Sequence, residues 1–417
     1  MSRPQDIEDL LRKLAPQVLS ALLRRHRSLD VCEDAVQEAL LAAAATWTAD
    51  DLPENPRGWL FTVATRRLID DVRSERARRA REDQIAVGAP PSELLTLGPE
   101  SAPVVDRDRD DTLTLLVLCC HPALSAPSQI ALTLRAVGGL STAEIAACFF
   151  VSEATMAQRI SRAKQTIRDA GARFEMPPEP ELGPRLAAVM HVLYLIFNEG
   201  YTTSSGARVN RVELTTEAIR LTRELRRLRP DDSEATGLLA LMLLTDARRA
   251  ARTTGAGELI DLAEQDRSRW DHARIEEGVA LITVALAHGP LGAYQLQAAI
   301  AAVHDEADRP EDTDWAQILA LHQILDRVAP NPMATLGRAV AAAMAIDPCA
   351  GLEIVDGLAE DRRIADHHRF HAVRGQLLEM AGEEQAARDA FRRAARLTTS
   401  VPEKRYLTAR AAGEQRS

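Results

Sequence analysis

The apolar residues of this chain recur at helical spacing from one end to the other. Residues 7–23 place leucine and valine on one face of a helix, and the same period returns in residues 30–47, 55–81 and 112–168. After residue 176, helical segments of about 10–16 residues follow one another, separated by Gly, Pro or Asp. The pattern therefore predicts an all-α chain.

Two helices joined by a short turn are predicted near the middle of the first half. Ser141, with Glu144 three residues further on, has the spacing of a capping box, so a first helix should start there and run to about Cys148. Ser152 can cap a second helix, in which Glu153 lies near the positive end of the helix dipole. The pair predicts a helix-turn-helix.

The outer face of the second helix is rich in hydrogen-bond donors. Such a composition can reach base edges and phosphates in a major groove. The residues that we expect to face solvent there are Gln158, Arg159, Ser161, Arg162, Lys164 and Arg168. The alternative is an alanine-rich helical protein whose capped helix pairs carry exposed arginines without binding DNA.

This window resembles region 4 of bacterial extracytoplasmic-function (ECF) sigma factors. The similarity lies in L-S-x-x-E-I-A, a turn, V-S-x-x-T and R-I-S-R-A-K, although Phe150 stands where that family usually has a turn glycine. The resemblance implies that the domain binds the flap of the RNA polymerase β subunit and reads the −35 promoter element, chiefly through Gln158 and Arg162. The residues that it places at bases or phosphates are Thr155, Ala157, Gln158, Arg159, Ser161, Arg162 and Lys164.

The segment 30–47 carries a polar face made by Asp34, Gln37 and Glu38, opposite an apolar face that contains Ala35 and Val36. Taken alone, such a face is typical of a solvated helix. However, E-D-A-V-Q-E-A-L resembles region 2.2 of sigma factors. That resemblance implies docking on the coiled-coil clamp helices of the polymerase β′ subunit.

The segment 55–81 begins N-P-R-G-W-L and continues through an arginine-rich stretch that resembles sigma regions 2.3 and 2.4. The resemblance implies capture of an unstacked base of the −10 element, which a pocket and a cationic groove can provide. The expected −10 residues are Asn55, Trp59, Thr62, Arg66, Arg67, Asp70 and Arg73. The alternative is an exposed helix end that happens to be rich in arginine.

The net charge of −10 is distributed unevenly. Residues 66–81 contain seven arginines against three acids, whereas residues 82–111 contain eight acids against two arginines. A protein that binds DNA alone usually has a broad basic face, so this chain is expected to bind DNA weakly alone and well in a larger assembly. Proline and glycine in the acidic segment predict an extended linker, which is either a disordered spacer or, as the resemblance implies, a strand in the RNA exit path.

The rest of the composition narrows the class of protein. The apolar runs are too short to span a membrane, and the start lacks a signal peptide's apolar core, so we expect a soluble cytoplasmic protein. The five cysteines form no C-x-x-C pair, and the histidines at 367, 368 and 371 share no carboxylate or cysteine at ligand spacing, so neither a metal nor another cofactor is expected. Phosphate-binding loops and nucleophile elbows are absent from the sequence, so an enzyme is not expected.

The segment after residue 176 shows a faint repeat. Its best unit, from Gly375 to Ala394, matches the offsets of a tetratricopeptide repeat and predicts a helical solenoid. In N-E-G-Y, the side chains of Asn198, Glu199 and Tyr201 are expected to form either a ligand pocket or contact with the preceding domains, or else a helix C-cap. With E-Q-D-R-S-R-W-D at residues 264–271, these features resemble the ECF subgroup that has a long tetratricopeptide-like extension.

Together these observations predict four parts: a region 2 domain at 1–81, a linker at 82–111, a region 4 domain at 112–176 and a regulatory helical domain at 177–417. The expected partners are core RNA polymerase and promoter DNA, with an intramolecular contact between the last domain and the sigma core. The alternative is a one-component regulator that binds DNA through its helix-turn-helix and senses a ligand through the helical array. That alternative leaves the polar face of residues 34–38 and the N-P-R-G-W-L helix without a role.

Overall fold

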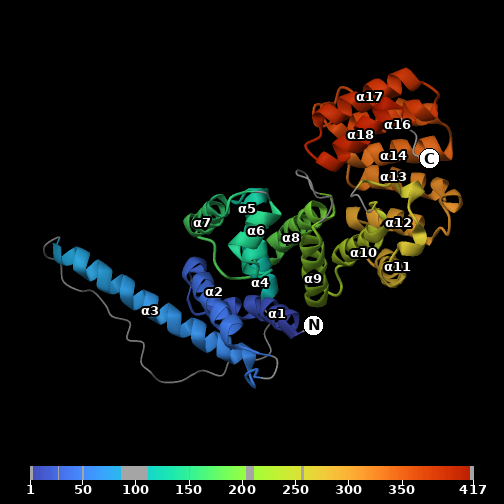
Figure 1. The fold of residues 1–417 in the computed structure, drawn as a ribbon. Coiled ribbons are helices and arrows are strands. Elements are labelled where there is room, and N and C mark those ends of the chain that lie inside the picture. Colours follow the sequence, from blue (N-terminus) through green and yellow to red (C-terminus); the bar gives the residue numbers. More distant parts are fainter. Residues whose placement is uncertain are drawn as a thin grey trace. The chain divides into compact units, whose positions relative to one another are not determined.

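The computed structural model describes residues 3–26, 28–48, 51–85, 111–149, 151–202, 211–254 and 258–413. Within this part the secondary structure is helical apart from two isolated β-bridges, which confirms the predicted all-α class (Figure 1). The chain forms two compact units, which meet in sequence between Val192 and Leu193, inside helix α8 (Glu179–Tyr201). Each unit is described by itself below.

Unit 1 begins with three helices, α1 (Arg3–Leu23), α2 (Leu29–Thr46) and α3 (Pro56–Ile85). Their apolar faces meet in a core to which Leu22, Val36, Leu60 and Ala64 contribute fully buried side chains. At the end of α2, the ring of Trp47 packs edge-on against that of Trp59, with centroids 5.2 Å apart. This contact fixes the loop between α2 and the start of α3.

The second part of unit 1 contains α4 (Thr112–Cys119), α5 (Ala126–Ala136), α6 (Thr142–Cys148) and α7 (Glu153–Asp169). Helix α4 is buried along its whole length, in keeping with its sequence T-L-T-L-L-V-L-C. Most of the predicted linker, residues 86–110, lies outside the described residues, as does Phe150 of the α6–α7 turn.

Unit 2 is made of helices that follow one another along the chain after α8. They are α9 (Val212–Leu228), α10 (Ser233–Ala247), α11 (His272–Ala287), α12 (Ala293–Glu306), α13 (Trp315–Val328), α14 (Pro332–Ala345), α15 (Pro348–Asp356), α16 (His368–Met380), α17 (Glu384–Leu397) and α18 (Val401–Ala412). In the described residues of this unit, short 3₁₀ helices lie between them at Arg249–Ala251, Leu262–Glu264, Arg267–Arg269 and Pro310–Asp312.

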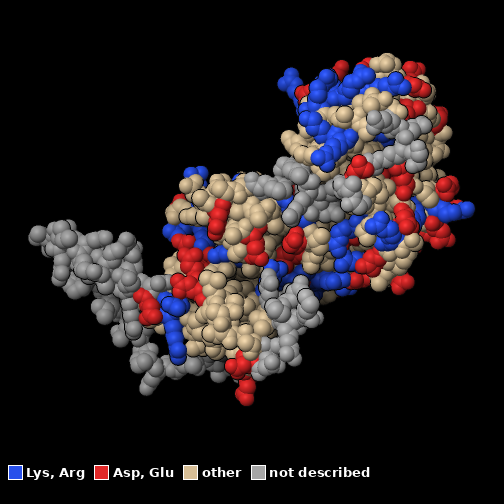
Figure 2. Space-filling view, in the orientation of Figure 1, with Lys and Arg blue, Asp and Glu red and all other residues tan. Residues whose placement is uncertain are grey.

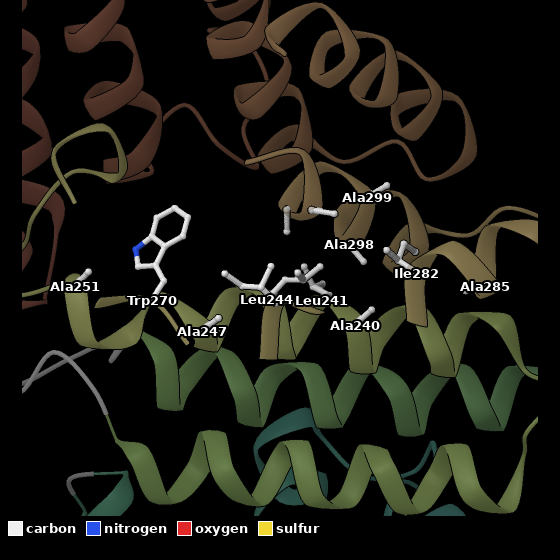
Figure 3. Packing of buried hydrophobic residues seen from close by; sticks show 13 residues of the cluster. Ala240, Leu241, Leu244, Ala247, Ala251, Trp270, Ile282, Ala285, Ala298 and Ala299 are labelled. Carbon is white, nitrogen blue, oxygen red and sulfur yellow. The ribbon is translucent and has the colours of Figure 1, made fainter. Parts of the chain in front are cut away.

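A core of small residues joins α10, α11 and α12 (Figure 3). Ala240, Ala298 and Leu244 are fully buried in it, so the helices approach closely. Trp270 closes one end of this core, and the guanidinium groups of Arg248 and Arg267 lie 5.5 and 4.6 Å from its ring centroid. The E-Q-D-R-S-R-W-D segment therefore has a structural role in this core.

Helices α16 and α17 pack against each other where Gly375 meets Phe391. A Cβ atom at residue 375 would lie 2.9 Å from the Phe391 ring, so glycine permits this close crossing. The last helix, α18, reaches back to a segment 145 residues earlier, because the Tyr406 hydroxyl donates to Asp261 Oδ2 at 2.6 Å. The helical C-terminal region is thus confirmed, while its tetratricopeptide character stays a prediction.

Candidate functional site

The helix-turn-helix forms as the capping pattern predicts. Ser141 Oγ accepts the Glu144 backbone N–H at 3.1 Å, and Glu144 Oε2 accepts the Ser141 backbone N–H at 2.7 Å, which completes the capping box. Ser152 Oγ accepts the Thr155 backbone N–H at 3.2 Å at the start of α7. Gly139, with φ of +70°, makes the turn that leads into α6.

Helix α7 has a buried and an exposed face. Its buried side consists of Met156, Ile160, Ala163 and Ile167, which pack on the rest of the domain. Of the predicted −35 residues, Thr155, Ala157, Gln158, Ser161 and Arg162 are exposed and Arg159 is half-buried. The donors of the first three turns are therefore accessible to a ligand as large as a DNA groove.

Lys164 departs from the expected pattern, since we expected it to face solvent and its side chain is only 6% exposed. Its Nζ atom donates to Glu33 Oε2 at 2.7 Å and to Asp34 Oδ1 at 3.2 Å, and it lies 3.2 Å from Asp30 Oδ1. Burial alone would lower the pKa of Lys164, but Glu33, Asp34 and Asp30 outweigh it, so the pKa is raised. The lysine is charged and held on α2.

Two arginines extend this contact. Arg135 Nε of α5 lies 2.7 Å from Glu33 Oε1, and the Glu33 side chain is 1% exposed. Arg168 donates to Asp30 Oδ2 at 3.1 Å. We refer to this set, Asp30, Glu33, Asp34, Arg135, Lys164 and Arg168, as the α2–α7 contact. A pocket of about 350 Å³ lies beside it, lined in part by Arg24 and Phe174.

The three predicted polymerase-binding residues lie on α2 in different surroundings. Asp34 is exposed and forms an ion pair with Lys164. Gln37 is half-buried, and the exposed Glu38 lies 3.3 Å from Arg67. Leu41, one turn beyond Gln37, is 70% exposed and continues the same face. Sequence reasoning missed Leu41, although an apolar residue four positions after Gln37 was the available signal.

The start of α3 gathers most of the predicted −10 residues. Asn55 Oδ1 accepts the Gly58 backbone N–H at 2.9 Å and so orders the first turn, while Trp59 is half-buried against Trp47. Thr62, Arg66, Arg67 and Asp70 follow along the helix with exposed side chains. The side chain of Arg73 lies outside the described part.

The N-E-G-Y segment forms a polar junction between α8 and α9. Glu199 lies 3.4 Å from Arg211 Nη1, and the Tyr201 ring stacks on Phe197 with centroids 5.8 Å apart. The Arg252 guanidinium lies 4.0 Å from the Tyr201 ring centroid. Asn198 is half-buried beside them. These contacts all fall within unit 2 and hold its first two helices together.

The described residues contain no cluster of His, Cys, Asp and Glu that could hold a metal ion. The adjacent Cys119 and Cys120 are buried free thiols, and burial raises the pKa of Cys120 to about 12. Among the described helices, none is long and apolar enough to cross a membrane.

Three family models match separate stretches of the chain. Residues 10–78 match sigma-70 region 2, residues 114–167 match sigma-70 region 4, and residues 185–286 match DUF6596, a family of unknown function. The chain thus has the domains of an ECF-type sigma factor, region 2 and region 4, followed by a C-terminal DUF6596 region. These two sigma regions assign it a role in directing RNA polymerase to promoters, and the family is not one of enzymes.

Two relatives set the extent of this similarity. An uncharacterized protein of Rhizobium meliloti (strain 1021) is 44% identical over 398 residues, which cover 94% of this chain and 92% of that protein. A probable ECF RNA polymerase sigma factor of Mycobacterium tuberculosis, SigI, is 27% identical over 184 residues, which cover 43% of this chain and 60% of SigI. No solved structure matches.

Proposed function

We propose that this sigma factor reads the −35 element with the exposed face of α7, chiefly through Gln158 and Arg162. The observation that carries the proposal is that both side chains are exposed on a capped second helix of a helix-turn-helix whose apolar side is buried. An arginine can donate two hydrogen bonds to guanine, and a glutamine can pair with adenine.

The start of α3 is proposed to bind the −10 element as a separated strand. Trp59 offers a partly exposed aromatic ring, and Arg66 and Arg67 lie about two turns further along the same helix. Aromatic stacking together with neighbouring cations is a common way to bind single-stranded DNA.

The polar face of α2 is proposed to bind the β′ clamp helices of core polymerase through Asp34, Gln37 and Glu38. Asp34 Oδ1 also accepts from Lys164, so polymerase binding at this oxygen would compete with one hydrogen bond of the α2–α7 contact. A one-component regulator has no use for this face or for the exposed start of α3, which favours the sigma function over that alternative.

The parts 1–81, 112–176 and 177–417 are proposed to act as region 2, region 4 and a regulatory extension, with 82–111 as the linker. Several short helices of unit 2 pack in succession along the chain, which supports a repeat-like regulatory domain of the tetratricopeptide kind.

Two variants test the division of labour, each assayed for retention of core polymerase and for transcription from a promoter selected with the unmodified chain. Gln158→Ala with Arg162→Ala should lower transcription at least about tenfold and leave polymerase binding intact, because base contacts are lost. Gln37→Arg with Glu38→Arg should lower both polymerase retention and transcription, because the charge of the docking face is reversed.

Gln165→Ala serves as the control, since Gln165 is exposed on α7 beyond the proposed reading face. Unchanged transcription from the Gln158/Arg162 variant would refute the assignment of α7. Normal polymerase retention by the Gln37/Glu38 variant would refute the assignment of α2.

A further inference from the structure

The C-terminal unit separates its charges along the sequence. Residues 193–361 contain 16 Lys and Arg against 27 Asp and Glu, whereas residues 362–412 contain 11 against 6. A unit that is acidic over most of its length therefore ends in a basic section. This section comprises α16, α17 and α18.

Packing directs these basic side chains outward. Phe391, Ala394 and Leu407 are buried in a core shared by the last three helices, so the remaining sides of α17 and α18 face solvent. Figure 2 shows Lys and Arg gathered over the part of the unit that Figure 1 labels α17 and α18. We call this set the basic surface: Arg388, Arg392, Arg393, Arg396, Lys404 and Arg405.

The described acids next to this surface pair with only three of its six cations. Arg388 donates to Glu384 at 3.0 Å, Arg392 pairs with Asp389, and Arg393 lies 3.3 Å from Asp366. These pairs are exposed, so each holds its arginine weakly. Arg396, Lys404 and Arg405 are exposed on either side of the α17–α18 turn, and none of them has an ion pair within the described residues. The surface therefore has cations to offer to an external anion.

The spacing suits a repeating anion. Arg388, Arg392 and Arg396 follow one another at four-residue intervals, so they form a row along α17 with about 6 Å between successive members. Guanidinium groups bind phosphate oxygens in a two-point geometry. A row of them matches a chain of phosphates better than it matches a single small anion.

Duplex DNA fits this surface better than a single strand does. Binding of single strands relies on exposed aromatic rings on which bases stack. The aromatic residues of α17 and α18 are engaged elsewhere, since Phe391 is buried and the Tyr406 hydroxyl donates to Asp261. The surface thus offers phosphate contacts and no platform for bases.

We propose that the basic surface binds the phosphate backbone of duplex DNA without regard to sequence. DNA binding by the basic surface is separate from the proposed promoter reading, because neither α3 nor α7 takes part in it. The extension would thereby add phosphate contacts to those of the sigma core, and such contacts position a protein on DNA without specifying bases.

The test measures binding of the full chain, without polymerase, to a random-sequence duplex of about 30 base pairs, between about 50 and 200 mM KCl. The variant is Arg396→Ser with Lys404→Ser and Arg405→Ser. If all three cations contact phosphates, the slope of log affinity against log salt should become shallower by about 2–3, and affinity at the lowest salt should fall at least about tenfold.

The matched control removes three exposed arginines of the same unit outside this surface, as Arg269→Ser with Arg309→Ser and Arg327→Ser. It changes the net charge equally and should keep the original slope. Equal slopes for the two triple variants would overturn the proposal. So would unchanged DNA binding combined with lost binding to polyglutamate, which would identify an acidic protein segment as the ligand.

This readout is independent of the promoter assay. Because the DNA has a random sequence and no polymerase is present, the salt slope does not depend on whether α7 reads the −35 element or α2 binds polymerase. Thermal melts of both triple variants check that the unit is folded, and a melt that differs from the unmodified chain is followed by Lys404→Ser alone, for which a slope change of about 1 is expected.

Discussion

The α2–α7 contact and the basic surface of α17 and α18 use the same kinds of side chain in opposite surroundings. In the α2–α7 contact, Lys164 and Glu33 are almost fully buried, and Lys164 has three acids within 3.2 Å. On the basic surface, the cations are exposed, and Arg396, Lys404 and Arg405 have no acid paired with them in the described part. Charge alone therefore does not indicate what a basic cluster does.

The two arrangements differ in the hydration of their charged groups. A buried ion pair has already given up its hydration, so removal of one partner leaves the other charged and unsolvated. An exposed cation keeps its water and exchanges it for a phosphate at little cost, with release of counterions from the DNA. The first arrangement holds two elements together, and the second remains free to bind.

The largest effect is expected from Glu33→Ala. This change leaves Arg135 without its acid and Lys164 with only Asp30 and Asp34, and loss of one partner of a buried pair costs about 3–5 kcal/mol. Hydrogen exchange of the α2 amides in the full chain measures the loss directly.

The control for this variant is Glu38→Ala on the same helix. Glu38 and Arg67 are both about half exposed, so their pair is expected to contribute less than about 1 kcal/mol. If the two variants lose similar protection, the α2–α7 contact does not behave as a buried ion pair.

The local elements of the sigma core followed from the sequence. Ser141, Glu144 and Ser152 determine where α6 and α7 begin, because a cap forms between residues only three positions apart. Local chemistry of this kind is visible in a single sequence. The exposure of Gln158 and Arg162 also followed, since one helical period determines both faces of α7.

The burial of Lys164 and Glu33 could not be predicted in the same way. Each resembles an ordinary solvated residue of its own helix, and the two are 131 positions apart. Their contact depends on how α2 and α7 pack, which no local pattern encodes. The reach of Tyr406 back to Asp261 escaped prediction for the same reason.

His304 of α12 sharpens the comparison, since it is a titratable group held near cations instead of acids. Burial, together with Arg248, Arg267 and His322, lowers the pKa of His304 to about 3. Because the folded pKa lies below the unfolded value, the neutral histidine contributes full stability above about pH 6.5. That contribution is lost as pH falls, by about 1.4 kcal/mol per pH unit until the folded pKa is approached.

Thermal melts of the full chain from neutral pH down to about pH 5 should therefore show a loss that His304→Asn reduces. Above about pH 7, the difference in stability between the unmodified chain and His304→Asn should no longer change with pH. An identical pH dependence in both proteins would mean that His304 titrates normally in the folded chain.

The smallest effect is expected where an ion pair is short but exposed. Arg223 of α9 donates to Glu277 of α11 at 2.5 Å, and both side chains are more than 40% exposed. Arg223→Ala should therefore change the unfolding free energy by less than about 1 kcal/mol, and added salt should reduce the difference further. Arg248→Ala, which breaks a pair of similar length with the fully buried Asp305 in the same unit, should cost several times more. Equal losses of unfolding free energy in the two variants would show that distance decides the strength of these pairs. A larger loss for Arg248→Ala would show that burial decides it.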